Sequence, residues 1–353
     1  MKLRVDNPGL FSTVQDLGRW GYQLSGVPVA GAMDGPALRL GNILLGNPQG
    51  AAGVEMTLLG AAFTVEEEGY FVVTGGEMGL CLDGKPAAAW QVHYAPCGAR
   101  LSFSGGLEGS RAYLCIAGGV DVPLVMGSAS TYTRGNFGGY EGRALKRGDV
   151  LVSGTADVLA ARSVGLCLPS ELRPDISNRP LPVIPGPQED AFTEAGQRTF
   201  FESEYSITQE SDRMGCRFEG PVIEHVQGAD IISDGITLGA IQIPGHGKPI
   251  ALLADRQTTG GYTKIGVLSP VGLEILAQRR VGESVRFRRA TRQEGVEEIR
   301  AFNRLCEEAE KLRAVWRSRA AQPAVSSSSA FSGTFLLTLK GQVYDVSVQS
   351  LED

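Results

Sequence analysis

The sequence predicts a mainly β protein built from two β-rich halves. Glycine makes up 47 of the 353 residues, about double the usual share of ~7%, and the glycines follow no collagen-like period. Between them lie short apolar runs rich in β-branched and aromatic residues, a pattern typical of strands separated by turns and bulges. Prolines are concentrated between residues 165 and 187, and the chain shows this pattern of short apolar runs on both sides of them.

The first half, residues 1–164, is predicted to be a first β-barrel domain of short strands bounded by glycine. The clearest strand candidates are residues 62–65, 70–74, 112–117 and 150–152. One helix is predicted over residues 33–45, because Asp34 suits the N-cap, Pro36 suits the first turn, and apolar residues follow at helical spacing.

Residues 165–187 are predicted to be a linker, since six prolines there disfavour both helices and central strands. Short apolar runs typical of strands occur again in residues 188–290, which we predict to be a second β-barrel domain. Within it, residues 250–254 are an apolar run typical of a buried strand, and polar residues follow directly.

The last part of the chain changes character. Residues 291–320 carry apolar side chains every three or four positions among charged ones, which predicts an amphipathic helix. This helix either packs on the second barrel or docks a partner. A serine-rich linker is expected over residues 321–333, and a short hairpin over residues 334–353, where apolar and polar residues alternate.

The polar residues after the run at 250–254, with a glycine pair among them, predict a site for a small carbonyl or carboxylate compound. Arginine can hold a carboxylate through two hydrogen bonds, lysine offers a point charge, and glycine amides can face an oxyanion. The second half is expected to provide catalytic Arg213 and Lys264, and to bind substrate through Arg256, Gln257, Thr258, Thr259, Gly260, Gly261 and Tyr262.

The first half is expected to complete one cleft between the two halves, because small-substrate sites tend to form where domains meet. Its predicted contribution is Asp34 as a catalytic residue, with Gln15, Asp16 and Arg19 for substrate binding. Two plainer alternatives stay open. The polar segment can be a hydrophilic hairpin loop, and the arginines can form internal ion pairs with Asp212 or Asp255.

Composition and motifs argue against several functions. A net charge of −6 offers no basic face to nucleic acid or to an anionic membrane. No apolar run reaches the ~18 residues of a membrane helix, and the N-terminus has no signal-like segment, so we expect a cytoplasmic protein. Neither a phosphate loop nor metal-ligand spacing of histidines and cysteines is present, so no metal site is expected.

Five short motifs follow one another along the chain: Thr-Val-Gln-Asp-Leu-Gly-Arg at 13–19, Gly-Ala-Met-Asp at 31–34, Ser-Asp-Arg-Met-Gly at 211–215, Gly-Ala-Ile-Gln at 239–242 and Asp-Arg-Gln-Thr-Thr-Gly-Gly-Tyr at 255–262. With them, residues 3–288 resemble the KipA family, which includes the C subunit of the ATP-dependent 5-oxoprolinase. That family is also similar to the carboxyltransferase part of urea carboxylase. The resemblance implies cyclophilin-like β-barrels in two β-rich halves.

The resemblance also implies an activity and partners. With a KipI-like 5-oxoprolinase subunit and a LamB/YcsF-like one, the chain would open 5-oxo-L-proline to L-glutamate. ATP would be used by the complex, and this chain alone is expected to be inactive. The chain departs from the family pattern at Thr263, where proline is usual, and in residues 268–273, where an acidic residue is usual. Both departures lie beside the predicted site and bear on the substrate.

Two other functions stay open. The similarity to urea carboxylase suggests a carboxyltransferase, and the terminal hairpin resembles the opening hairpin of a biotinyl carrier domain. Because the chain has no Met-Lys-Met sequence, no covalent biotin is expected on it, and biotin would be carried on another protein. The KipA name implies instead a regulator that binds a KipI-like inhibitor of a histidine kinase. Such a regulator needs an interface and no catalytic site.

Overall fold

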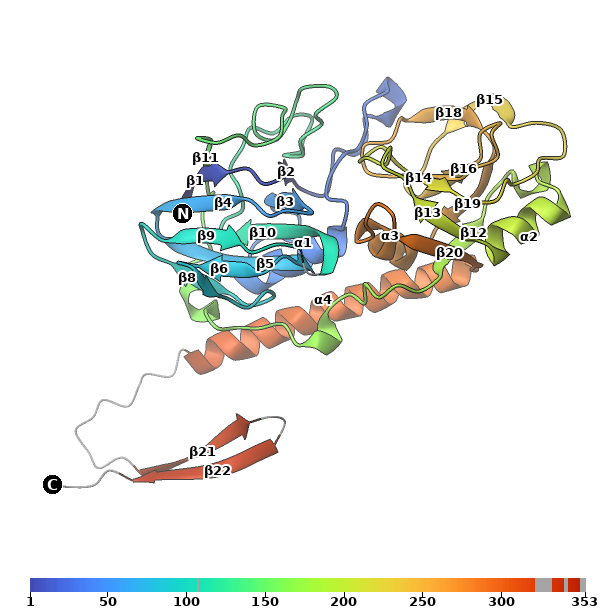
Figure 1. Ribbon diagram of the computed structural model, residues 1–353. Coiled ribbons are helices and arrows are strands. Elements are labelled where there is room, and N and C mark those ends of the chain that lie inside the picture. Colours follow the sequence, from blue (N-terminus) through green and yellow to red (C-terminus); the bar gives the residue numbers. More distant parts are fainter. Residues whose placement is uncertain (107, 321–331, 340–341, 350–353) are drawn as a thin grey trace.

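A computed structural model describes residues 1–106, 108–320, 332–339 and 342–349. Two β-rich halves lie side by side, and one long helix, α4 (Arg292–Ala320), runs beneath both of them (Figure 1). The prediction of a mainly β protein with a C-terminal helix is confirmed. Residues 321–331, which make up most of the predicted serine-rich linker, lie outside the described residues.

The strands of the first half form two sheets around a common apolar core. The six-stranded sheet has the order β11-β1-β4-β9-β6-β7, and the five-stranded sheet has the order β2-β3-β10-β5-β8. Their bounds are β1 (Lys2–Asn7), β2 (Phe11–Gln15), β3 (Gly53–Thr57), β4 (Ala62–Glu67), β5 (Gly69–Glu77), β6 (Leu80–Leu82), β7 (Lys85–Pro86), β8 (His93–Ala95), β9 (Arg100–Phe103), β10 (Glu108–Ile116) and β11 (Val150–Val152). The four strand candidates of this half are all confirmed.

Helix α1 (Gly35–Leu45) packs on the five-stranded sheet and confirms the helix predicted over residues 33–45. The Asp34 carboxylate caps it by accepting a hydrogen bond from the Ala37 amide at 3.0 Å. Pro36 lies in the first turn, where no amide donor is needed. Gly46 ends the helix with a left-handed φ of 82°.

Seven strands of the second half close into a barrel in the order β12-β19-β16-β17-β14-β13-β20. A two-stranded ribbon, β15 with β18, and two short helices complete this half. The bounds are β12 (Leu181–Pro185), α2 (Glu194–Glu202), β13 (Glu204–Ile207), β14 (Gly215–Glu219), β15 (Asp230–Gly235), β16 (Ala240–Gln242), β17 (Ile250–Leu252), β18 (Thr259–Tyr262), β19 (Lys264–Leu268), α3 (Pro270–Ala277) and β20 (Ser284–Arg289). Four 3-10 helices are η1 (Gln23–Ser25), η2 (Ala160–Ser163), η3 (Ser170–Leu172) and η4 (Glu189–Ala191).

The linker between the halves is shorter than the sequence predicts. Residues 181–185 are expected to belong to the proline-rich linker, but they form β12, which pairs with β19 and β20. Proline removes only its own amide donor, and the Pro182 carbonyl still accepts a hydrogen bond from the Ser269 amide at 2.9 Å. A barrel strand therefore tolerates Pro182 and Pro185.

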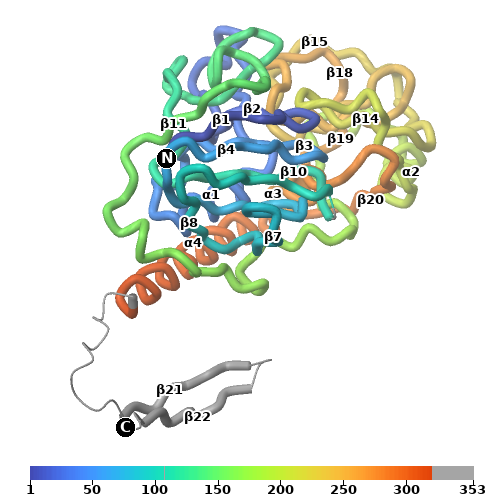
Figure 2. The backbone as a smooth tube through the Cα atoms, turned by 60° about the vertical axis from the view of Figure 1, so that its left-hand side comes forward, coloured from blue at the N-terminus to red at the C-terminus, as the bar shows by residue number. Residues whose placement is uncertain are grey.

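Helix α4 is buried mainly on the first half, whereas its sequence pattern predicts packing on the second barrel or on a partner. Cys306 and Ala309 lie in one apolar cluster with α1. In the last turn of α4, the Arg317 guanidinium donates a hydrogen bond to the Leu45 carbonyl at 2.9 Å. This carbonyl lies at the C-terminus of α1, where the helix itself offers it no amide partner. Because α4 also contacts α3, it connects the two halves, as Figure 2 shows from the side.

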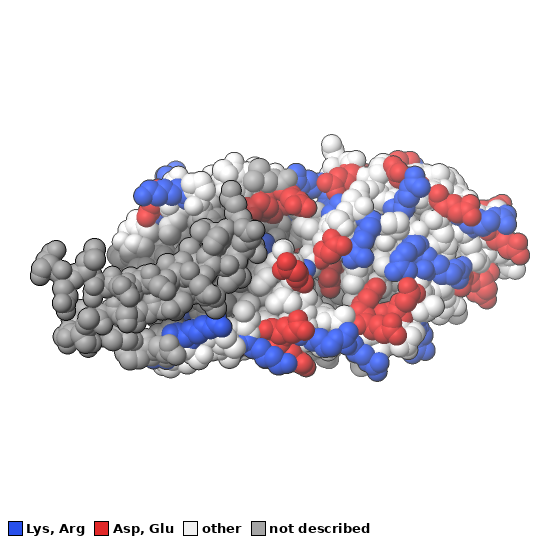
Figure 3. All heavy atoms as spheres, turned by 90° about the horizontal axis from the view of Figure 1, so that it is seen from below, with Lys and Arg blue, Asp and Glu red and all other residues white. Residues whose placement is uncertain are grey.

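The predicted terminal hairpin is present as β21 (Ser332–Leu339) and β22 (Gln342–Gln349), which pair antiparallel. Residues 340–341 and 350–353 lie outside the described residues. Of the helices described, none combines the length and the apolarity that crossing a bilayer requires. Acidic and basic side chains alternate over the underside of the molecule that is visible in Figure 3, and neither sign gathers into one patch there.

Candidate functional site

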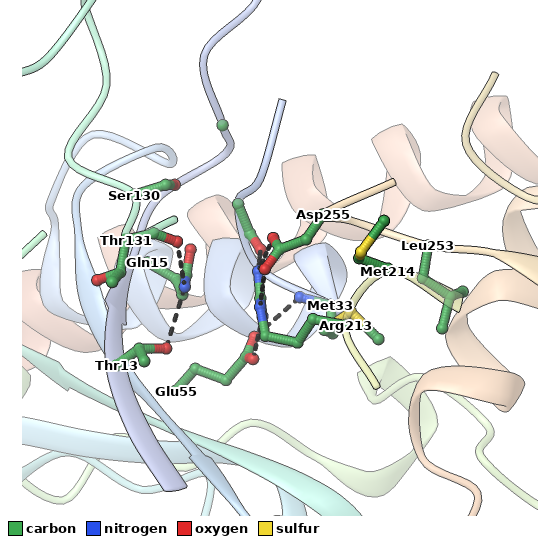
Figure 4. A network of polar contacts seen from close by, with 12 residues as sticks. Thr13, Gln15, Met33, Glu55, Ser130, Thr131, Arg213, Met214, Leu253 and Asp255 are labelled. Carbon is green, nitrogen blue, oxygen red and sulfur yellow. Dashed lines mark hydrogen bonds and ion pairs between the residues drawn. The ribbon is translucent and has the colours of Figure 1, made fainter. Parts of the chain in front are cut away.

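Arg213 joins the two halves through buried ion pairs. Its guanidinium donates to the Asp255 carboxylate of the same half, from Nε at 3.1 Å and from Nη2 at 3.0 Å. Across the interface, Nη1 donates to Glu55 on β3, and Nη2 donates to the Gly31 carbonyl at 2.6 Å. Figure 4 shows the arginine between the two carboxylates. We call Arg213, Glu55 and Asp255 the ion clamp.

The ion clamp is satisfied by the protein itself. Burial alone would lower the pKa of Arg213, but the carboxylates of Glu55 and Asp255 raise it above its usual value. Glu55 also accepts hydrogen bonds from the Tyr113 hydroxyl at 2.7 Å and the Met33 amide at 2.8 Å. The alternative of an internal ion pair with Asp255 is thus confirmed for Arg213. A direct role of Arg213 with substrate stays a prediction.

Backbone geometry brings the Gly31 carbonyl to the ion clamp. Gly31 has a left-handed φ of 91°, and a Cβ atom there would lie 2.9 Å from the Gly18 amide nitrogen. Only glycine fits this position without moving the neighbouring loop, which explains one residue of the Gly-Ala-Met-Asp motif.

Asp34 makes a second connection between the halves. Its Oδ2 atom accepts a hydrogen bond from Gln278 Nε2 at 2.6 Å, in addition to the cap on α1. Gln278 follows α3 and is 1% exposed. Its Oε1 atom accepts from the amides of Ser110 and Arg111, both at 3.0 Å. Burial raises the pKa of Asp34, although the hydrogen bonds from Gln278 and Ala37 oppose this shift.

We expect Gln278→Ala to lower the free energy of unfolding by about 1–3 kcal/mol for each buried partner left without a hydrogen bond. Chemical denaturation of the wild type and the variant measures the difference. Gln293→Ala is the control, because Gln293 is exposed and donates a hydrogen bond to Glu297 on its own helix at 2.8 Å. Equal losses for the two variants would show that Gln278 does not hold the halves together.

A polar cleft of about 400 Å³ lies at the barrel and contains two residues of the predicted site, Gln257 and Tyr262. The first half contributes Arg134, which pairs with Asp212 across the interface at 2.8 Å. Lys264 lies next to this cleft, since it pairs in register with Gln242, another lining residue. Its buried ammonium is 3.3 Å from the Asp234 carboxylate.

A second space of about 370 Å³, here called the inter-half cavity, contains Arg256. Arg256 is 5% exposed and donates only to backbone carbonyls, from Nε to Ile236 at 3.3 Å and from Nη1 to Leu253 at 3.2 Å. Burial lowers its pKa to about 10, and within the part of the chain that the structure describes it forms no ion pair. Its charge is therefore available to an anionic ligand.

The walls of the inter-half cavity come from both halves and from α4. They are mostly apolar and include Leu17, Trp20, Met33, Leu238, Leu273 and Phe302. Glu274 of α3 lines the same cavity. Burial, with smaller effects of Asp34 and Glu298, raises the pKa of Glu274 to about 8. An apolar pocket with an unpaired cation and a perturbed carboxyl group is typical of a small-molecule site.

The other predicted residues lie elsewhere. Asp16 accepts hydrogen bonds from Gly18, Ser128 and Ala129, each at 2.7 Å, so it holds the loop around residues 128–130. Gln15 donates to Thr13 and Thr131, as Figure 4 shows. Arg19 is buried over the ring of Phe137 at 4.8 Å. Thr258, Thr259, Gly260 and Gly261 lie on or beside β18.

The expectation of one cleft for all predicted residues is therefore wrong. They divide among the ion clamp, the polar cleft, the inter-half cavity and loop supports, and several of them hydrogen-bond to other protein groups there. Sequence reasoning missed Glu55, Glu274 and Gln278. None of the three lies in a motif, and only tertiary contacts identify them.

The raised pKa of Glu274 predicts a pH dependence of stability. Between about pH 4.5 and pH 8 the folded protein keeps a proton that the unfolded chain has lost, so the free energy of unfolding falls as the pH rises through this window. Glu274→Gln should remove this contribution and be more stable than the wild type at pH 8 but not at pH 4.5. Denaturation at both pH values tests it, with Glu297→Gln as an exposed control; parallel pH profiles of wild type and Glu274→Gln would refute it.

Comparison with known proteins identifies relatives of this architecture. Residues 25–289 match the family model described as carboxyltransferase domain, subdomain A and B. The chain is 37% identical to the C subunit of 5-oxoprolinase from Escherichia coli over 289 residues, which is 81% of this chain and 90% of that protein. The corresponding C subunit from Haemophilus influenzae is also 37% identical, covering 80% of this chain and 89% of that protein.

A solved structure extends this likeness to a larger enzyme. The K. lactis urea amidolyase superposes with a TM-score of 0.82 at 30% identity, over 88% of this chain and 20% of the amidolyase chain. The likeness thus concerns about a fifth of that enzyme.

Proposed function

The chain belongs to the family of the carboxyltransferase domain, subdomains A and B, and from this membership we propose that it is the C subunit of an ATP-dependent 5-oxoprolinase. The complex converts 5-oxo-L-proline to L-glutamate. The proposal is supported by two relatives of that name, each aligned over about nine-tenths of its length.

The unpaired Arg256 in the inter-half cavity is the observation that supports a substrate site there. 5-Oxoproline has one carboxylate and a small lactam ring with apolar methylene groups. Arg256 binds the carboxylate, and the apolar walls contact the ring. Glu274, protonated near neutral pH, donates a hydrogen bond to the lactam oxygen. A volume of about 370 Å³ lies within the usual ~300–1,000 Å³ range of ligand pockets.

Opening a lactam with water is coupled here to ATP in three steps. The γ-phosphoryl group is transferred to the lactam oxygen and ADP leaves. Water then adds to the activated carbon and the ring carbon–nitrogen bond breaks, which leaves an acyl phosphate on the opened chain. A second water hydrolyses this acyl phosphate and releases glutamate and phosphate. Because this chain carries no phosphate-loop motif, ATP is bound at the level of the complex. The KipI-like and LamB/YcsF-like partners supply what this chain lacks, and the chain alone is inactive.

Reconstitution tests the proposal. The chain is combined with a KipI-like and a LamB/YcsF-like protein, and glutamate formed from 5-oxoproline is measured with and without ATP. We expect glutamate only from the full set with ATP. The same mixture without this chain is the control. A complete, folded complex that forms no glutamate would refute the proposed function.

Carboxyl transfer is the second candidate function, and the similarity to urea amidolyase over 88% of this chain favours it. In that case biotin arrives on a separate carrier protein. Avidin capture of the assembled complex, followed by exchange of labelled bicarbonate into substrate, separates the two candidates. Label exchange without glutamate formation supports carboxyl transfer, and glutamate formation without a biotinylated partner excludes it.

A further inference from the structure

A third, smaller cavity lies between the halves, and we propose that it binds a small inorganic oxyanion such as phosphate or bicarbonate. Its volume is about 120 Å³. Three arginines line it: Arg111 from β10 of the first half, and Arg279 and Arg280 from the segment that follows α3 in the second half. It shares no lining residue with the inter-half cavity that contains Arg256.

Two of these arginines have buried hydrogen-bond donors without a partner in the part of the chain that the structure describes. Arg111 donates through Nη1 to Ser110 Oγ at 3.1 Å and to the Ala277 carbonyl, but its buried Nε has no partner. Arg280 donates through Nε to the Gly109 carbonyl at 2.9 Å, and its buried Nη2 has no partner among the described residues. A buried donor without a partner is costly, and more so when it carries a charge.

The remaining charged groups of this cavity are already paired. Arg279 lies 3.5 Å from Glu283. Asp212 accepts through Oδ1 from the Met214 and Gly215 amides, and its Oδ2 atom is paired with Arg134 outside the cavity. Among the described residues, Arg111 and Arg280 form no ion pair, and both line this one small space. An anion bound there lies beside both guanidinium groups.

Size and donor geometry define the class of ligand. A volume of about 120 Å³ suits an oxyanion of four or five heavy atoms and is well below the ~300–1,000 Å³ of pockets for larger ligands. Guanidinium groups match the oxygen atoms of phosphate and carboxylate-like ions. Since Arg111 and Arg280 belong to different halves, the bound anion connects them. Phosphate would come from ATP hydrolysis and bicarbonate from carboxyl transfer.

The test is thermal unfolding of the full chain with potassium phosphate, bicarbonate or chloride at equal ionic strength and pH. We expect a saturable rise in Tm with an oxyanion and none with chloride. Arg280→Gln should lose this rise. Arg286→Gln, which removes the same charge from an exposed pair with Glu204, should keep it. A rise with phosphate alone or with bicarbonate alone supports the site and identifies the source of the anion.

Two results would overturn the inference. One is a Tm that does not respond to phosphate or to bicarbonate more than to chloride. The other is a rise that is equal in the wild type and in folded Arg280→Gln, because the anion would then bind elsewhere. If Arg280→Gln does not fold, calorimetric titration of the wild type with each anion decides, and the absence of saturable heat counts against the site. All readouts are of binding, so failure here leaves the proposed activity unaffected.

Discussion

Arg213→Met is expected to lower the free energy of unfolding by about 3–5 kcal/mol, because Glu55 and Asp255 would stay buried with no cation between them. Denaturant titration at pH 7 measures this loss. The matched control is Arg134→Met, which breaks the Arg134–Asp212 pair across the same interface. That pair is exposed, so its loss should cost under about 1 kcal/mol.

A triple variant, in which two further substitutions are added to Arg213→Met, sharpens the experiment. If the loss comes from uncompensated charge, neutralising both carboxylates in Arg213→Met, through Glu55→Gln and Asp255→Asn, should recover part of the stability. A folded Arg213→Met protein as stable as the wild type but inactive in the complex would contradict the ion clamp. It would instead support the prediction from sequence that Arg213 contacts the substrate.

Arg256→Met is expected to lower activity without lowering stability, which is the opposite of the effect expected for Arg213→Met. Losing a charged hydrogen bond to the substrate carboxylate costs about 1.5–3 kcal/mol, so kcat/KM of the reconstituted complex should fall roughly ten- to hundredfold. Stability should stay the same or rise, since the variant removes a buried charge that has only backbone partners. Glutamate formation and denaturation of the same preparation measure both effects.

Arg256→Lys serves as the control for Arg256→Met. It keeps the positive charge but loses the planar pair of donors, so an intermediate kcat/KM is expected. Unchanged kcat/KM in folded Arg256→Met would remove Arg256 from the substrate site, and with it the observation on which the proposed cavity depends.

Helices and strands could be predicted from the sequence where the residues that determine them lie close together in the chain. Asp34 and Pro36 indicate the start of α1, and alternating or β-branched runs indicate the strands, because caps and strand patterns involve residues close in sequence. The strand β12 was missed, since Pro182 and Pro185 argue against a strand unless their pairing partners are known.

The site was predictable only in part, because its decisive contacts are long-range. The motifs contain both Arg213 and Arg256, but the two side chains differ in their partners. Glu55, which pairs with Arg213, lies 158 residues earlier in the chain. Arg256 has only the backbone of Ile236 and Leu253. Sequence alone offers no means to tell a paired arginine from an unpaired one, whereas the tertiary structure shows carboxylate partners for Arg213 and none for Arg256 among the described residues.

The burial of Cys306 and Ala309 against α1 determines when the first half can finish folding during synthesis. N-terminal segments leave the ribosome first and usually fold first. Here, however, the outer face of α1 stays uncovered until the last long helix has emerged, after the whole second barrel has been made. The N-terminal half is thus the first to be synthesised and the last to be completed. Expressed alone, residues 1–164 would expose that apolar face and bind a chaperone or a hydrophobic dye.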